Sequence, residues 1–284
     1  MKAPSFAYAK PSSLAEAFDL LERHGPDAEL LAGGQSLIPT LNMRLSAPSI
    51  LIDITGLRGL DGISVSGSKV RIGALTTHRT IERSAEVAKH LPLLAQAAPH
   101  IAHVAIRNSG TIGGSIAMAD PAAEWPACCV ALDAEFTLAS KTGERRVKAR
   151  EFSRGLYDTA LAPNEILTAI EFPIAAADQR SVFLELARRH GDYAIVGLAA
   201  VAQVKAGKAS DVQLAFLGVG STPVLAKNAM AAVEGKKIAP DTITAAQNAL
   251  DKDLDPSADL YTSPATKRHL ARVLLGRALA ALTE

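Results

Sequence analysis

The sequence predicts an α+β protein of more than one domain, and three observations lead to that prediction. Its 284 residues suggest one large domain or two to three smaller ones, with ample chain for a buried core. The hydrophobic pattern opens on a strand–helix–strand succession and continues with hairpins and short helices. It closes on three strands that amphipathic helices follow, and no internal repeat interrupts this order.

Composition argues against several classes of function. The chain is 48% hydrophobic and 21% charged, with a formal net charge of +1. A near-neutral chain without clustered Lys and Arg gives no electrostatic case for nucleic acid or an anionic membrane. The N-terminal "MKAPSFAYAKPSS" lacks the apolar core of a signal peptide, and no apolar run approaches the length of a membrane span. We therefore expect a cytoplasmic chain without a membrane span.

Residues 1–56 are predicted to form a first, β-α-β-like subdomain. In "PSSLAEAFDLLERHG", Ser13 and Glu16 fit a helix capping box, and Gly25 fits a C-terminal stop. "AELLAG" and "SILIDI" are predicted as short buried strands, with a turn and a helix in "SLIPTLNMRL" between them.

Residues 57–176 are predicted to form a second subdomain, an antiparallel sheet with helices. "ISVSGSKVRIGA" and "AEFTLASKTGERRVKAREF" have the alternation and turn residues of hairpins, and "EILTAIEFP" is a strand closed by Pro173. "TTHRTIERS", "LPLLAQAAPHIA" and "AEWPACCVAL" are predicted helices. "TIGGSIAMAD" is predicted to be extended and broken by its glycines.

Residues 177–284 are predicted to form a separate C-terminal α+β domain after a linker in "IAAADQRS". "VFLELARR", "AIVGLAAVAQVKAG" and "ASDVQLAFLGVG" are predicted as a three-stranded antiparallel meander. Amphipathic helices are predicted in "PVLAKNAMAAVEG", "PDTITAAQNALDKD" and "PATKRHLARVLLGRALAAL".

The sequence carries no signature of self-contained catalysis. It lacks the zinc-protease, serine-hydrolase and P-loop patterns, and its seven histidines are scattered. His100 and His103 could share a helix face, a spacing that is more often structural than metal-binding. The only cysteines, Cys128 and Cys129, are adjacent in an apolar setting, so they cannot supply a four-ligand zinc or iron–sulfur site. We expect buried, inert thiols and no metal.

Two short segments share a glycine pattern: "AGGQS" (32–36) and "TIGGS" (111–115). A Gly-Gly step has no Cβ atoms, so backbone N–H groups can approach and point at an anion. Ser36 and Ser115 could add hydroxyl donors, and two such loops could hold a pyrophosphate from opposite sides. Neither segment is a G-x-G-x-x-G, which argues against the usual dinucleotide-binding fold. For each segment alone, a plain tight turn is the alternative.

The stretches around these loops resemble a known family. "LLAGGQSLIPTLNMRL" and "RNSGTIGGSIAMADPAAEWPA" resemble the two flavin-binding segments of the medium subunit of molybdenum hydroxylases, the family of carbon monoxide dehydrogenase and xanthine dehydrogenase. "ARRHGDYAIVGLAA" resembles that family's third landmark, and the resemblance covers essentially the whole chain. It implies a two-subdomain FAD-binding fold of the vanillyl-alcohol oxidase type, plus a C-terminal α+β domain.

By this resemblance, both glycine segments wrap the FAD pyrophosphate, chiefly through backbone N–H groups. Glu124 occupies the position of an acidic residue near the adenosine end of FAD, and Asp120 is a neighbouring candidate. Charge at a helix N-terminus is the alternative for both, and for Asp120 we favour a helix cap. The full set of expected cofactor-binding residues is Leu31, Ala32, Gly33, Gly34, Gln35, Ser36, Leu37, Ile101, Thr111, Ile112, Gly113, Gly114, Ser115, Asp120, Glu124, Leu167 and Tyr193.

Three members of this set lie outside the glycine segments and the acidic pair. Ile101 matches an apolar contact to adenine and Leu167 matches a leucine at the flavin end, with ordinary core packing as the alternative. Tyr193 matches an aromatic position beside the isoalloxazine ring, with a half-buried strand-end tyrosine as the alternative. It is the one candidate catalytic residue.

This chain departs from the family pattern at three positions. Ser115 stands where Asn or Asp is common, and Glu124 stands where Asp is usual. Glu185 stands near a position where Lys is common, which could change the charge near the flavin. None of these changes removes the backbone contacts expected at the phosphates.

The resemblance implies an oxidoreductase component, an FAD-binding electron-transfer subunit. A large partner subunit would carry molybdopterin and oxidise the substrate. A small partner with [2Fe–2S] clusters would pass electrons through FAD to an external acceptor, in an (αβγ)2 heterohexamer. The alternatives are a self-contained flavin oxidoreductase of the same fold and a non-catalytic scaffold subunit with a vestigial FAD site.

Overall fold

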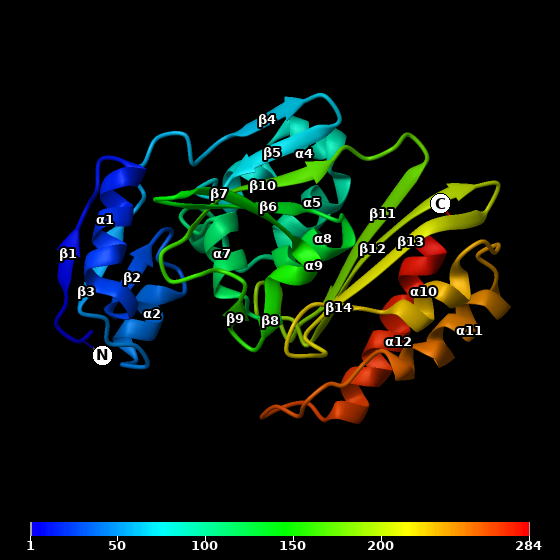
Figure 1. The fold of residues 1–284 in the computed structure, drawn as a ribbon. Coiled ribbons are helices and arrows are strands. Elements are labelled where there is room, and N and C mark those ends of the chain that lie inside the picture. Colours follow the sequence, from blue (N-terminus) through cyan, green and yellow to red (C-terminus); the bar gives the residue numbers. More distant parts are fainter. Residues whose placement is uncertain (1, 284) are drawn as a thin grey trace.

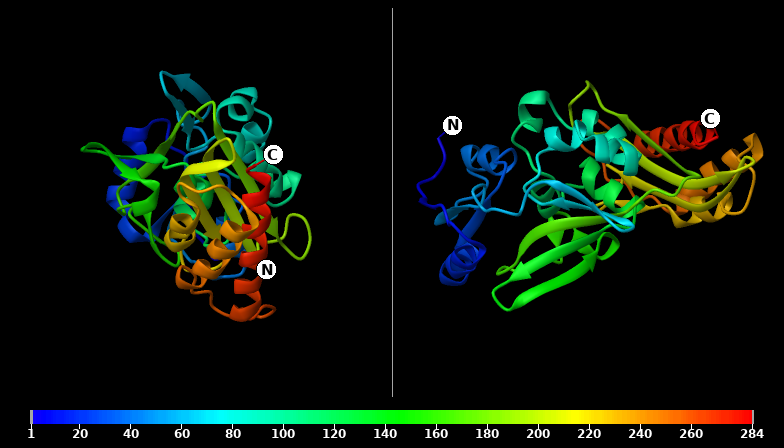
Figure 2. Two further views of the ribbon diagram at one scale, coloured as in Figure 1. Left: turned by 90° about the vertical axis from the view of Figure 1, so that its right-hand side faces the viewer. Right: turned by 90° about the horizontal axis from the view of Figure 1, so that it is seen from above.

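The computed structural model describes residues 2–283, and its three main sheets lie in a row (Figure 1; Figure 2, right). The sheets follow the order of the chain, so the N-terminal sheet lies at one end and the C-terminal sheet at the other. Among residues 2–283, no helix combines the length and the apolar character that a membrane span requires.

The first sheet is parallel and has three strands, with β3 in the centre. Its strands are β1 (Ala7–Ala9), β3 (Ile50–Asp53) and β2 (Ala28–Leu31), and its helices are α1 (Leu14–His24), η1 (Gly25–Asp27) and α2 (Leu37–Asn42). The expectation of two buried strands is right for β3 and wrong for β2, which lies at a sheet edge and is only half-buried. Ser13 caps α1 and Gly25 ends it with φ 54°, as predicted. The Glu16 carboxylate accepts from Ser12 instead of closing the predicted capping box.

The second sheet is antiparallel and has five strands, which confirms both predicted hairpins. Its strands in spatial order are β4 (Ile63–Ser66), β5 (Lys69–Gly73), β10 (Ile166–Pro173), β6 (Glu135–Ser140) and β7 (Gly143–Lys148). A separate two-stranded sheet joins β8 (Ser153–Gly155) and β9 (Asp158–Thr159). The associated helices are α3 (His78–Glu82), α4 (Ala85–His90), α5 (Pro92–Ala97), η2 (Ala98–His100), α6 (Val104–Arg107), α7 (Ile112–Met118), α8 (Glu124–Ala131) and α9 (Ala149–Phe152).

Helix α7 contradicts the prediction of an extended, glycine-broken stretch in "TIGGSIAMAD". Thr111 caps this helix, because its side chain accepts from the N–H of Gly114. Gly113 lies so close to Ala74 that an added Cβ would be 2.5 Å from the Ala74 Cβ. The glycines lower helix propensity, and tight packing against Ala74 overrides that local preference.

The third sheet is antiparallel with four strands, one more than the predicted meander. Its strands are β11 (Gln179–Leu186), β12 (Val196–Lys205), β13 (Lys208–Leu217) and β14 (Val224–Leu225). The sequence signal for β14 is too short to detect, since it pairs with β13 over two residues. The remaining helices are α10 (Lys227–Val233), α11 (Pro240–Ala249), η3 (Leu250–Lys252) and α12 (Pro264–Ala281).

The third sheet is covered on both faces. Helices α10–α12 pack against one face, as Figure 1 shows, and form a core with Leu198 and Phe216. On the other face, Ala199 and Leu217 belong to the core of the middle part of the chain, together with residues of α5 and α8. Burial on both faces explains why β12 is an almost continuous apolar run.

Candidate functional site

The structure brings the two glycine segments together. A Cβ added to Gly33 would lie 2.3 Å from the carbonyl oxygen of Ser109 and 2.7 Å from the Cα of Gly110. Gly114, in the second segment, faces Ala32, since its Cβ would lie 4.0 Å from the Ala32 Cβ. The first loop therefore lies directly against the backbone that leads into the second.

The first loop offers free backbone donors. Within residues 2–283, the N–H groups of residues 33–37 have no hydrogen-bond acceptor. Gly34 has φ 69°, a conformation that glycine adopts readily and that turns the chain between β2 and α2. The Ser36 side chain makes no capping hydrogen bond to α2. Several backbone N–H groups without acceptors at one turn suit the binding of an anion.

The second loop differs from this pattern, because its backbone donors are already used. The N–H of Ile112 donates to Thr76 at 3.0 Å, and that of Gly113 donates to Ala74 at 2.8 Å. The N–H groups of Gly114 and Ser115 donate to Thr111, at 3.1 Å each. This loop can offer side-chain hydroxyls, whereas the free backbone N–H groups belong to the first loop.

A buried histidine supports the second loop, and nothing in the sequence pattern indicated it. The indole N–H of Trp125 donates to Nδ1 of His78 at 2.9 Å, although the two residues are 47 positions apart. A Cβ on Gly110 would lie 2.7 Å from Nε2 of the same ring. Burial, and then the charge of Arg107, lower the pKa of His78 to about 4. The neutral ring thus joins the glycine loop to α8.

The acidic segment 120–124 lies next along the chain. Asp120 does not cap α8 as predicted: its Oδ1 accepts from the N–H of Ala122 at 2.9 Å, and the helix begins only at Glu124. Proline at 121 and the left-handed Ala119 favour this extra turn before the helix. The carbonyl of Pro121 accepts from the N–H of Gly218, which ties the segment to the end of β13.

Glu124 and Tyr193 share one electrostatic neighbourhood. Glu124 is 8% exposed, and burial raises the pKa of its carboxyl to about 7. The Tyr193 ring is 76% exposed. Partial desolvation by surrounding groups raises the pKa of the Tyr193 hydroxyl, and the charges of Asp120 and Glu124 raise it further. The resemblance places Glu124 near the adenosine end of FAD and Tyr193 beside the isoalloxazine ring, and both placements stay predictions.

Ile101 and Leu167 are core residues. They are 7% and 5% exposed and belong to the middle core. Leu167 lies on β10 opposite Leu138, beside a β-bulge. Core packing accounts for both side chains, and contact of either one with a ligand stays a prediction.

The cysteines are buried free thiols. Burial raises the pKa of both Cys128 and Cys129, which disfavours the reactive thiolate. Within residues 2–283, the structure contains no group of three or more potential His, Cys, Asp or Glu metal ligands.

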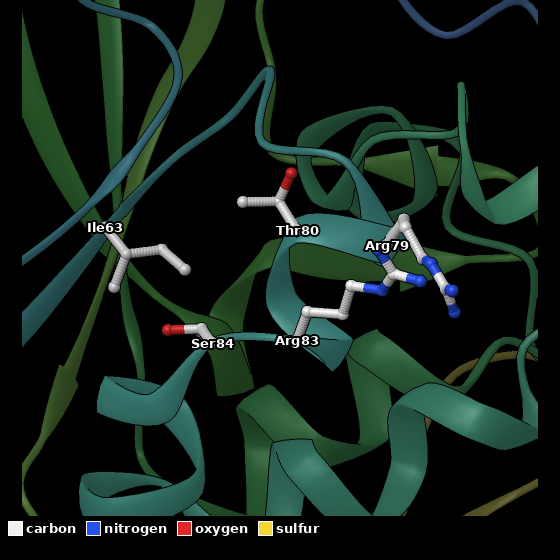
Figure 3. A pocket seen from close by; sticks show the side chains of 5 residues that line it. All are labelled: Ile63, Arg79, Thr80, Arg83 and Ser84. Carbon is white, nitrogen blue, oxygen red and sulfur yellow. The ribbon is translucent and has the colours of Figure 1, made fainter.

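A separate hollow lies between β4 and α3, and Figure 3 shows the side chains that line it. It measures about 540 Å³, and its lining residues are Ile63, Arg79, Thr80, Arg83 and Ser84. None of them is an expected site residue, and Arg79 is paired with Glu82. The converging glycine loops, and not this hollow, mark the candidate site.

The arrangement fits a dinucleotide cofactor. A loop of free N–H groups in contact with a second glycine loop suits a pyrophosphate, and an unpaired carboxyl and an exposed tyrosine lie near the segment that follows. Fold and site together fit a dinucleotide-binding protein that is not of the Rossmann type.

Comparisons with known proteins agree with this class. Residues 4–175 match the family "FAD binding domain in molybdopterin dehydrogenase", and residues 181–282 match "CO dehydrogenase flavoprotein C-terminal domain". The 6-hydroxypseudooxynicotine dehydrogenase complex subunit alpha of Paenarthrobacter nicotinovorans is 39% identical, covering 99% of this chain and 95% of that one. The carbon monoxide dehydrogenase medium chain of Hydrogenophaga pseudoflava is 37% identical, covering 97% and 96%.

Solved structures show the same likeness. The carbon monoxide dehydrogenase of Hydrogenophaga pseudoflava, in a form lacking the Mo-pyranopterin moiety, superposes with a TM-score of 0.97 at 39% identity, over 100% of this chain and 99% of that one. Quinoline 2-oxidoreductase from Pseudomonas putida 86 gives a TM-score of 0.94 at 37% identity, over 99% and 98%. The chain belongs to the family of FAD-binding medium subunits of molybdenum hydroxylases, and is an oxidoreductase subunit.

Proposed function

We propose that this chain receives electrons from [2Fe–2S] clusters in a partner subunit and passes them through FAD to an external acceptor. The observation that carries the proposal is the contact of Gly33 with Ser109 and Gly110, which joins a loop of free backbone donors to the second glycine loop. FAD, when bound, supplies the redox chemistry, while the protein positions it and tunes its potential.

Different residues would bind different parts of FAD. The N–H groups of residues 33–37 would donate to the pyrophosphate, and the hydroxyls of Ser36 and Ser115 would add two further donors. Glu124 would lie near the adenosine end of FAD, and Tyr193 beside the isoalloxazine ring. The exposed Tyr193 ring would then cover the isoalloxazine on the side open to an acceptor.

The partners follow from the proposed role. A large molybdopterin-binding subunit would oxidise the substrate, a small subunit would hold the iron–sulfur clusters, and the complex would be an (αβγ)2 heterohexamer in the cytoplasm. The names of the relatives support an assembly, since one is a "complex subunit" and others are "medium" chains or subunits. The two buried, adjacent thiols of this chain support placing the clusters in another subunit.

Purification of the full chain tests the proposal directly. We expect a yellow protein with flavin absorbance at about 450 nm, reducible only slowly without its partners. A chain that takes up no FAD, even with both partner subunits present, would refute the proposal and favour a non-catalytic scaffold subunit. Turnover of a substrate by the chain alone would favour the self-contained oxidoreductase instead.

A further inference from the structure

Gly110 is in contact with both the first glycine loop and the ring of His78. A Cβ on Gly33 would lie 2.7 Å from the Cα of Gly110, and a Cβ on Gly110 would lie 2.7 Å from Nε2 of His78. The backbone N–H of His78 also donates to the carbonyl of Gly110 at 2.9 Å. A displacement of the His78 ring would therefore displace Gly110 and, through it, the loop that contains Gly33.

The segment that leads to His78 is fixed to the second glycine loop. Backbone hydrogen bonds join residues 74–78 to residues 110–113, and Thr77 and Thr111 form an antiparallel bridge in the same place. Thr77 caps α3, so the ring of His78 extends from the first residue of that short helix. The second loop thus sets the position of the His78 backbone, while the ring extends to a third segment.

That third segment is the start of α8. Nδ1 of His78 accepts from the indole N–H of Trp125 at 2.9 Å, and the two ring centroids are 6.0 Å apart. Because Nδ1 is the acceptor, the single proton of the neutral imidazole lies on Nε2, the nitrogen that faces Gly110. One rigid ring therefore contacts the glycine loops through one nitrogen and α8 through the other.

The start of α8 depends on this hydrogen bond. Ala123, at the N-cap of α8, has no side-chain oxygen to cap the helix. Trp125 is fully buried, and within residues 2–283 its indole N–H has no acceptor other than His78. A buried indole donor that loses its acceptor is costly, so the bond holds Trp125 in place. Glu124, the residue before Trp125, is held with it.

We propose that His78 is a positioning residue for FAD, because its hydrogen bond to Trp125 fixes Glu124 relative to the two glycine loops. The assignment of Glu124 to the adenosine end and of the loops to the pyrophosphate rests on the proposed function, whereas the contacts of His78 do not. If those assignments hold, the bond sets the distance between two groups that grip the same half of the cofactor.

Titration with FAD tests this role in the full chain, or in the complex with its partner subunits if only the complex takes up FAD. H78F keeps a flat ring without an acceptor and should raise the Kd for FAD about tenfold. H78N keeps an oxygen near the position of Nδ1, so its Kd should stay closer to that of the wild type. H269F, the same change as H78F at an exposed position on α12, should leave the Kd unchanged.

Two features separate positioning from mere stability. A variant that is only less stable loses folded molecules and so binds less FAD, but the molecules that remain folded keep their Kd. W125F removes the donor instead of the acceptor and should raise the Kd as H78F does. The double variant should add no further loss, because both changes break one interaction.

A wild-type Kd in H78F overturns the proposal. An H78N variant as weak as H78F overturns it too, because ring packing and not the hydrogen bond would then matter. If the Phe variants fail to fold, hydrogen exchange in the wild type decides. The only tryptophan gives one indole N–H signal, and FAD should slow its exchange about tenfold or more, since binding that depends on the bond must stabilise it. Unchanged exchange refutes the role of His78, whereas a wild type that takes up no FAD in either form refutes the proposed function.

Discussion

Gly33 and Ser109 are in backbone contact across 76 positions of the chain, and a Cβ on Gly33 would lie 2.3 Å from the Ser109 carbonyl oxygen. Backbone atoms cannot move aside as a flexible side chain can. Because Gly33 has no Cβ, the two loops can approach closely. The positions of the backbone N–H groups of residues 33–37 depend on that close approach.

Gly33→Ala should weaken FAD binding by about tenfold or more, which corresponds to about 1.4 kcal/mol. Its methyl group would push the loops apart, with a cost in folding stability of about 1–3 kcal/mol. Flavin titration of the purified chain and urea unfolding measure the two effects. Gly56→Ala is the matched control, since its Cβ would meet only the flexible end of Lys10, at 3.2 Å. Equal flavin affinity in both variants contradicts the prediction.

Fluorescence of the only tryptophan should report FAD binding. Trp125 is fully buried next to Glu124, and its emission overlaps flavin absorption, so bound FAD should quench it by energy transfer. The quenching should saturate at one FAD per chain in the wild type and require a higher FAD concentration in Gly33→Ala. Emission that is unchanged by stoichiometric FAD would place the cofactor far from α8.

Arg107→Met should cost about 3 kcal/mol in the free energy of unfolding, because removing one partner leaves buried acceptors unpaired. The Arg107 guanidinium donates to the carbonyls of Ile101 and Ala102 at 2.9 Å each and to Glu82 at 3.1 Å. Arg79→Met removes a more exposed partner of the same Glu82 and should cost less than about 1 kcal/mol. Denaturant unfolding measures the loss in the free energy of unfolding for both variants. Equal losses would contradict the prediction that the buried contacts of Arg107 stabilise the fold.

Asp53 should make the protein sensitive to strong acid. Burial alone would raise its pKa, but hydrogen bonds from Thr55 and Tyr8 and the nearby Lys10 lower it to about 2. This folded pKa is below the unfolded value, so the stabilisation is complete above pH ~4 and disappears as pH falls through about 2. It amounts to about 2 kcal/mol. Asp53→Asn should flatten the pH dependence of unfolding between those limits, and an unchanged slope would contradict the assignment.

Local signals predicted much of the fold. The cap at Ser13, the "KTGE" hairpin turn and the apolar face of α12 are encoded in neighbouring residues, and the structure contains all three. Helix α7 escaped prediction because its stability depends on Ala74, far along the chain. The two-residue β14 is too short to leave a pattern.

The candidate site shows the same division. Both glycine loops could be recognised as sequence motifs. Their resemblance to a family predicted that both bind the FAD pyrophosphate. The His78–Trp125 hydrogen bond joins residues 47 positions apart, and no spacing rule connects them. Glu185 was noted only as an unusual residue, and the burial of its Oε2 atom depends on how β11 packs against α5.

The covering of the third sheet on both faces has a consequence for dissecting the protein. A cut at the linker near residue 176 would separate the two family regions, yet it would expose Leu217 and Ala199 on one piece and α5 and α8 on the other. Each fragment would then expose a large apolar surface to water and would be expected to self-associate or to bind chaperones. The FAD-binding region therefore cannot be transferred to another protein on its own, because its core is completed by the C-terminal region.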